Sequence, residues 1–151
     1  MFRFGSLSTM RLNTASPNMQ RLMRAVMAKQ LMDFAVLQGH RGEVEQNSAF
    51  ESGASKVRWP NSRHNSNPST AVDIAPYPID WGEEGSQAHR RKAIGRFYKL
   101  AGIVLATAKE LGIEVRWGGD WAMDGNVFNQ TFDDLVHFEE VLPVVQLREA
   151  A

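Results

Sequence analysis

The residues of this chain best suited to chemistry are histidines that stand near carboxylates. His64 precedes Asp73 by nine residues, and His137 follows Asp134 by three. A hydrolytic zinc site needs three imidazole or carboxylate ligands, an open position for water, and a carboxylate that moves protons. His64, Asp73 and His137 are candidate ligands. Asp134 is then a candidate base, and Arg41 a candidate cation for the charge that develops on the substrate oxygen.

Spacing alone leaves an ordinary interpretation open for these residues. A histidine in a loop is usually a surface residue, and His64 stands in an Asn-, Ser- and Pro-rich stretch at 60–70. Asp73 is less ordinary because it lies in the apolar run 71–75, where an ionised carboxylate in a half-buried strand needs a partner. A metal would supply that partner. The spacing by itself does not decide between a metal site and surface histidines.

Several short segments follow one another in order along residues 33–140. They are Gly39-His40-Arg41 with Gln46, Ser62-Arg63-His64, Ala71-Val72-Asp73-Ile74-Ala75-Pro76-Tyr77, Trp117-Gly118-Gly119-Asp120-Trp121 and Asp134-Leu135-Val136-His137-Phe138-Glu139. Together they resemble one family of zinc peptidases, which includes D-Ala-D-Ala carboxypeptidases, VanX-type dipeptidases and phage L-alanyl-D-glutamate endopeptidases. The opening segment at 2–5 and the start of a helix at Pro17 also look like the phage endolysin branch.

The resemblance implies a role for individual residues and a fold like that of the hedgehog domain and the D-Ala-D-Ala peptidases. It implies one zinc ion per chain. The residues that match the family's positions are the zinc ligands His64, Asp73 and His137, the catalytic acid/base Asp134, the substrate-binding Arg41, and the supporting residues Ser62 and Gln46.

Two departures from the family pattern indicate which branch of the family, endopeptidase or dipeptidase, the chain resembles more. The loop between His64 and Asp73 is two residues longer than the usual one, a length that some phage members share. The acid is Asp134, where the dipeptidases carry Glu, which favours the endopeptidase branch. The function implied is a zinc-dependent peptidoglycan endopeptidase, a phage endolysin that cleaves the L-Ala–D-Glu bond of stem peptides and lyses the host. Arg41 and Arg63 are cationic partners for such a carboxylate-rich peptide.

Two other functions remain open on the same scaffold. One is a D-Ala-D-Ala carboxypeptidase or dipeptidase, which would release D-Ala or D-Ala-D-Ala. The other is a zinc-stabilised binding domain without catalysis, which would need neither Asp134 nor Arg41.

The acidic loop 120–133 carries four side chains with oxygen atoms, Asp120, Asp124, Asn126 and Asp133. They could hold a regulatory Ca²⁺, but no EF-hand spacing is present and a plain polar loop is the favoured interpretation.

The remaining histidines and two tryptophans give less specific predictions. We expect His40 to pack beside the site and His89 to be exposed. Trp117 and Trp121 line either a substrate groove or the core.

The expected elements are those of an α+β domain with a small, mostly antiparallel sheet packed with helices. Ser16 and Pro17 suit a helix start, and its methionine row reads as core. A long apolar stripe over 87–111, stopped by Gly112, predicts the main helix. Residues 43–52 predict another helix, whereas 33–37, 71–75, 113–117 and a short segment from His137 predict strands.

Composition bounds the remaining possibilities. The 151 residues carry 17 basic and 17 acidic side chains and no cysteine, so disulfides, thiolate metal sites and bulk attraction to nucleic acid are excluded. We expect one catalytic domain over 1–151, without a separate wall-binding domain, acting as a monomer on peptidoglycan stem peptides. No membrane span and no signal peptide are evident. The expected enzyme is made in the host cytoplasm and reaches the cell wall, in the periplasm, after membrane permeabilisation.

Overall fold

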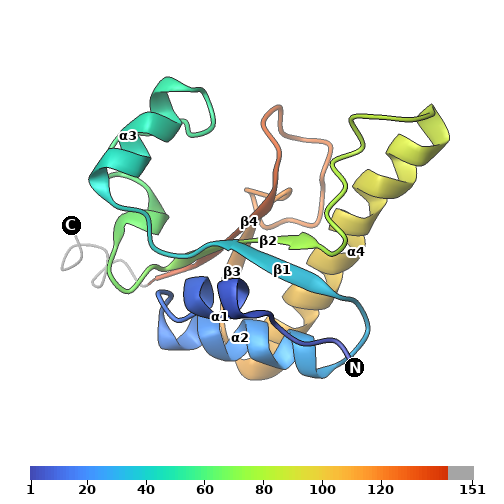
Figure 1. The fold of residues 1–151 in the computed structure, drawn as a ribbon, viewed down its shortest axis with the longest axis horizontal. Helices are drawn as coiled ribbons and strands as arrows, with labels where there is room; N and C mark the ends of the chain where they lie inside the picture. Colours follow the sequence, from blue (N-terminus) through green and yellow to red (C-terminus); the bar gives the residue numbers. More distant parts are fainter. Residues whose placement is uncertain (143–151) are drawn as a thin grey trace.

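The central feature of the structure is a four-stranded antiparallel sheet in the order β1-β2-β4-β3. It is seen in a computed structural model that describes residues 1–142 (Figure 1). The neighbouring strands β2 and β4 come from distant parts of the chain, and Asp73 pairs directly with His137 across them. The sheet register therefore brings two candidate ligands together. The strands are β1 (Phe34–Gln38), β2 (Ala71–Pro76), β3 (Val115–Gly118) and β4 (Asp134–Glu140).

Four α-helices and one 3₁₀ turn surround this sheet. In Figure 1, α1 and α2 lie below the sheet, α4 runs from the upper right of the view down past the sheet, and α3 stands apart at the upper left. The loop 119–133 rises on the same side as α3, which leaves the cleft between them. The helices are α1 (Ser6–Leu12), α2 (Pro17–Ala28), α3 (Glu43–Glu51) and α4 (Gln87–Leu111), and the 3₁₀ turn is η1 (Arg63–Asn65).

The alternation of β2 separates the core from the cleft. Val72 and Ile74 are fully buried on the core face, and Asp73 between them points to the opposite face, as predicted. On the core face these side chains pack with those of α2 and α4. The shared core makes residues 1–142 a single α+β domain, which confirms the predicted fold class.

The two best-signalled helices form for the reasons visible in the sequence. Ser16 Oγ accepts a hydrogen bond from the backbone N–H of Met19 at 3.3 Å, and Pro17 occupies the first helical position of α2. The methionines of α2 are core residues, as expected. The long helix α4 ends at Gly112, whose φ of 70° is the left-handed conformation that glycine adopts most easily.

The largest differences that bear on the site or the fold lie in three elements, whereas the bounds of β1, β2 and α3 differ from the prediction by one residue and the turn η1 lies in the predicted loop. Helix α1 was not predicted, because its short apolar pattern has no side-chain cap at Gly5. Strand β3 begins at Val115, two residues later than expected. Strand β4 begins at Asp134, three residues earlier than expected, because a register shift after Trp117 pairs Gly118 with Asp134. Asp134 is therefore a strand residue fixed by backbone pairing.

None of the helices within residues 1–142 combines the length and apolar character that crossing a membrane requires.

Candidate active site

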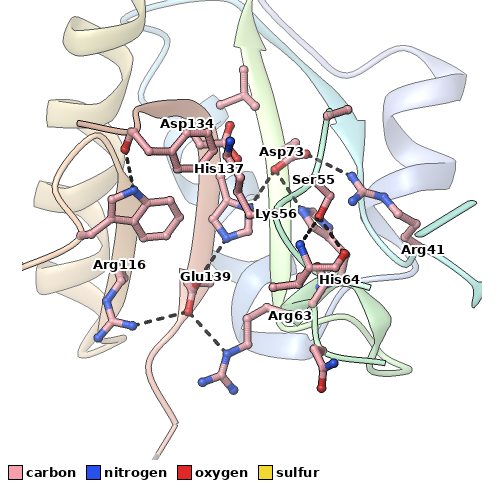
Figure 2. A pocket seen from close by; sticks show the side chains of 17 residues that line it. Arg41, Ser55, Lys56, Arg63, His64, Asp73, Arg116, Asp134, His137 and Glu139 are labelled. Carbon is pink, nitrogen blue, oxygen red and sulfur yellow. Dashed lines mark hydrogen bonds and ion pairs between the residues drawn. The ribbon is translucent and has the colours of Figure 1, made fainter. Parts of the chain in front are cut away.

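The candidate site is a cleft of about 600 Å³ on the sheet face opposite the core. Its walls come from the segments on either side of α3, the turn η1, and the strands β2, β3 and β4 with the loop that precedes β4 (Figure 2). The residues assigned to chemistry from the sequence meet there. The lining includes Arg41, Ser62, His64, Asp73, Asp134 and His137.

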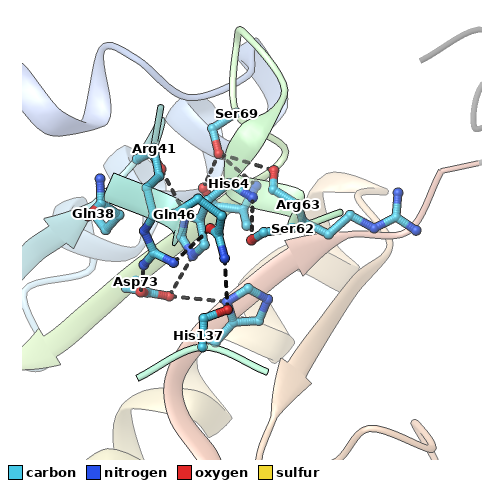
Figure 3. Close-up of polar contacts among 12 residues, drawn as sticks. Gln38, Arg41, Gln46, Ser62, Arg63, His64, Ser69, Asp73 and His137 are labelled. Carbon is cyan, nitrogen blue, oxygen red and sulfur yellow. Dashed lines mark hydrogen bonds and ion pairs between the residues drawn. The ribbon is translucent and has the colours of Figure 1, made fainter. Parts of the chain in front are cut away.

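The three candidate ligands converge on one point. His64 Nε2 lies 3.0 Å and His137 Nδ1 lies 3.1 Å from the same Oδ1 of Asp73. Their ligand atoms all lie within 4.8 Å of one another, and both histidines are buried. Figure 3 shows them side by side, one from η1 and two from paired strands.

The hydrogen bonds around this cluster fit a metal-binding donor set. His64 Nδ1 lies 2.8 Å from the carbonyl oxygen of Gly39, which can only accept, so the Nδ1–H donates and the Nε2 lone pair faces Asp73. His137 Nε2 lies 3.0 Å from Glu139 Oε1 and is held in the same way. Ring nitrogens thus face a carboxylate oxygen, an arrangement that needs a cation or extra protons between them. Two imidazoles and one carboxylate are ligands that suit a borderline ion.

The pKa values show how strongly charge is coupled in the cluster. Burial alone would raise the pKa of Asp73, but the charges and hydrogen bonds of His64 and His137 hold it well below its usual range. Burial alone would lower the pKa of His137, but hydrogen bonds to Asp73 and Glu139 raise it to about 10. The pocket therefore stabilises positive charge beside Asp73, which is the position a metal ion would take.

Asp134 faces this cluster from the first position of β4. Its burial, together with the negative charge of Asp73, raises its pKa above the usual value for aspartate. A carboxylate with a raised pKa exchanges protons closer to neutral pH than an ordinary one. A Cβ at Gly118 would collide with the backbone of Asp134, so glycine there permits the approach that fixes Asp134.

Arg41 reaches the cleft through a buried support. Its Nη2 lies 3.8 Å from Asp73 Oδ2, and its Nη1 donates to Gln46 Oε1 at 3.1 Å. Gln46 is fully buried, and its Nε2 donates to Ser55 Oγ and the carbonyl of Val57. Gln46 therefore ties Arg41 to the segment that forms one cleft wall.

Ser62 acts on the position of His64. Its Oγ accepts a hydrogen bond from the backbone N–H of His64 at 3.2 Å, and its own N–H donates to Asn65 Oδ1. This reciprocal pair caps the turn η1. The Ser-x-His pattern thus has a local structural cause.

Residues 1–141 match the family described as phage L-alanyl-D-glutamate peptidase. The chain belongs to that family. It is 30% identical over an alignment of 133 positions to the L-alanyl-D-glutamate peptidase of Escherichia phage T5, and the match covers 85% of this chain and 88% of the relative. It is also similar to the crystal structure of the L-Ala D-Glu endopeptidase ChiX of Serratia marcescens, with a TM-score of 0.67, 25% identity, and coverage of 92% of this chain and 90% of that one.

The other aromatic and histidine candidates of this family member divide between core and cleft. Trp117 is buried in the core, where its Nε1 donates to the Leu135 carbonyl. Trp121 lines the cleft and packs against His137, with ring centroids 5.6 Å apart. His40 is bonded to the Ser66 carbonyl and does not line the cleft, whereas His89 is exposed and pairs with an aspartate.

The acidic loop of this family member gains no support as a calcium site. Both carboxylate oxygens of Asp120 accept backbone N–H bonds, from Asp124 and Gly125. Asp124 accepts from the Asn126 N–H and the Asn129 amide. Within residues 1–142, the His64–Asp73–His137 group is the cluster whose ligand atoms converge. Calcium binding stays an untested prediction.

Sequence reasoning gave no role to Glu139, Arg116 or Lys56, which also line the cleft. Strand alternation could have predicted the place of Glu139, because it stands two residues after His137 in a strand and therefore lies on the same face. Arg116 pairs with Glu139 across β3 and β4, a register the sequence does not show. Lys56 lies in a loop and carried no signal.

Proposed function

We propose that this chain is a zinc-dependent peptidoglycan endopeptidase that cleaves the bond between L-Ala and D-Glu of the stem peptide. The observation that carries the proposal is the convergence of His64 Nε2, His137 Nδ1 and Asp73 Oδ1 in a cleft that also holds Asp134 and Arg41. The names of the phage T5 relative and of ChiX support the choice of bond.

His64, Asp73 and His137 would hold the zinc ion. When bound, such an ion lowers the pKa of a water molecule and polarises a carbonyl group. Its binding also satisfies the ring nitrogens that face the carboxylate of Asp73. Zinc is favoured over magnesium or calcium because two of the three ligands are imidazoles.

Asp134 moves the proton in the proposed reaction. Its carboxylate takes a proton from the attacking water, whose oxygen forms the new bond to the L-Ala carbonyl carbon. The carbon–nitrogen bond of the resulting tetrahedral intermediate then breaks, and Asp134 delivers the proton to the leaving amine of D-Glu. The raised pKa of Asp134 suits both transfers.

Arg41 supplies positive charge for the tetrahedral intermediate. Its guanidinium lines the cleft and retains donors beyond those directed at Gln46 and Asp73. A donor fixed before reaction stabilises an oxyanion without reorganisation. Gln46 and Ser62 are positioning residues, the first for Arg41 and the second for His64.

We also propose a cellular setting, which the description of the family as a phage peptidase supports. The enzyme would be made in the host cytoplasm, reach the wall after the membrane is permeabilised, and work there as a monomer that lyses the cell.

The decisive experiment pairs metal content with product analysis. We expect about one zinc per chain, activity on purified stem peptide that is lost on chelation and restored by zinc, and release of L-Ala from the D-Glu fragment. Asp134→Asn is expected to retain zinc and lose hydrolysis, with Asp124→Asn as a control outside the cleft. Release of D-Ala or D-Ala-D-Ala would indicate the carboxypeptidase or dipeptidase instead. Zinc binding without hydrolysis by the unmodified chain would indicate a binding domain.

A further inference from the structure

Two arginines converge on one carboxylate at the end of the cleft beyond His137. Arg63 Nε lies 3.5 Å and Arg116 Nη1 lies 3.7 Å from the same Oε2 of Glu139. The two arginine side chains are each 35% exposed, whereas the Glu139 side chain is 10% exposed. Figure 2 shows the guanidinium groups on either side of Glu139. Two positive charges are therefore held near each other with one carboxylate between them.

The single carboxylate of Glu139 neither neutralises both guanidinium groups nor accepts from all of their donors. Its other oxygen, Oε1, is already engaged by His137 Nε2 at 3.0 Å. The two arginine contacts are longer than a good hydrogen bond. Arg116 Nε is buried and has no hydrogen-bond partner within residues 1–142. A buried donor without an acceptor is costly, which shows that Glu139 alone does not satisfy Arg116. Because both arginine side chains remain partly exposed, their other guanidinium donors are open to an additional anion in the cleft.

The two arginines are placed by rigid elements. Arg116 is the register partner of Glu139 across β3 and β4. Arg63 begins the turn η1 and directly precedes the candidate ligand His64. Functional groups carried by strands and capped turns are held in more exact positions than groups on mobile loops.

We propose that Arg63 and Arg116 form a subsite that binds a free carboxylate of the stem peptide during cleavage. The inference rests on the proposed function. Glutamate has two carboxyl groups, and continuation of the peptide uses one, so the D-Glu next to the scissile bond keeps a free carboxylate. Guanidinium groups match a carboxylate in shape and charge. The subsite is separated from the ligand cluster by the imidazole ring of His137, which suits a group that flanks the scissile bond.

The cleft holds two other cationic side chains, Arg41 and Lys56, which have to be compared with Arg63 and Arg116 as carboxylate-binding groups. Arg41 pairs with Asp73 and is assigned to the reacting carbonyl. Lys56 lies on another wall, with its Nζ 5.0 Å from the ring centroid of Phe132. Lys56 is the competing candidate for carboxylate binding, so its substitution discriminates between the two walls.

The test uses zinc-loaded enzyme and two stem peptides that differ only in the free carboxylate of D-Glu, present in one and converted to an amide in the other. We expect the unmodified enzyme to show a KM about tenfold or more lower for the carboxylate peptide. Arg116→Gln is expected to remove that preference by raising KM for the carboxylate peptide alone, with kcat retained. Arg116→Lys should keep part of it, and Arg63→Gln is a second variant with the same expected loss. Lys56→Gln, and Arg91→Gln on the exposed face of α4, should keep the preference.

Three results would overturn the subsite. Equal slowing of both peptides by Arg116→Gln and Arg63→Gln would mean that the arginines only support Glu139 and His137. Loss of the preference in Lys56→Gln alone would move carboxylate binding to the other wall. Equal KM values for both peptides in the unmodified enzyme would remove the subsite while leaving the proposed function intact. Cleavage of neither peptide would instead contradict the proposed function.

Discussion

At the scale of single residues, the outer nitrogen of His137 is held by Glu139 at 3.0 Å. A carboxylate in this position fixes the orientation of a ligand ring and raises its basicity, and losing it typically costs about ten- to a hundredfold in metal affinity. We expect Glu139→Gln to weaken zinc binding by about that factor, measured by competition with a colorimetric chelator. Glu114→Gln, at an exposed position directly before β3, is the control. Equal zinc affinities for the two variants would show that Glu139 does not orient His137.

The pH dependence of the rate belongs to the same scale. The proposed base must be ionised, and burial and the charge of Asp73 raise the pKa of Asp134. The inactive protonated form therefore persists to higher pH than for an ordinary aspartate, and kcat/KM falls as the pH drops through this raised pKa. We expect a bell-shaped profile whose acid limb lies above the usual aspartate range, with zinc content measured at each pH to separate metal loss. A flat profile from about pH 5 to 9 would contradict the mechanism.

At the scale of elements, the start of β4 depends on close contact with β3. A Cβ on Gly118 would meet the backbone and side chain of Asp134. We expect Gly118→Ala to displace Asp134, to reduce activity at least tenfold, and to destabilise the fold by about 1–3 kcal/mol. Zinc content should be retained, since the ligands lie elsewhere. The measurements are peptide hydrolysis, thermal unfolding and zinc content.

A matched glycine in α4 serves as the control for that substitution. Gly102 is exposed, and a Cβ there would meet nothing within 4 Å. Gly102→Ala should stabilise the helix by about 0.5–1 kcal/mol and leave activity unchanged. Full activity of Gly118→Ala would mean that the β3–β4 contact does not position Asp134.

The elements that the sequence predicted well carry their own local signals. Helices α2 and α4 have caps and apolar stripes, and the alternation around Asp73 defines β2. The start of β4 and the whole of α1 were missed, because tertiary pairing and packing determine them more than local pattern does. The same division holds at the site.

Residues in the site that belong to short motifs were found from their resemblance to a family. His64, Asp73 and His137 are in this group, and the structure brings them together. Arg116 and Lys56 were not found, because what makes them cleft residues is cross-strand register and the fold of a loop. Periodicity along the chain carries neither kind of information.

At the scale of the whole molecule, the ligand cluster links the turn η1 to the paired strands β2 and β4. A ligand that binds only the native state stabilises it by about 2.7 kcal/mol at a concentration of 100 Kd. For a domain of this size, that corresponds to a rise in Tm of about 5–10 °C. We expect zinc to raise the Tm by this amount in thermal unfolding followed by circular dichroism, and chelation to reverse the rise.

Variants separate this stabilisation from catalysis. Asp134→Asn should show the same zinc-dependent rise in Tm as the unmodified protein, while His137→Ala should show none. A rise that survives in His137→Ala would place the stabilising metal somewhere other than the proposed cluster.

The pairing of Asp73 with His137 also has a consequence for the order in which the protein becomes active. Strand β4 is the last strand of residues 1–142, yet it lies between β2 and β3 in the sheet. During synthesis β2 and β3 are complete before β4, so a chain that stops short of β4 has neither Asp134 nor His137. We therefore expect a truncated chain lacking β4 to be catalytically silent, because the proposed acid/base and one proposed ligand both arrive with this strand.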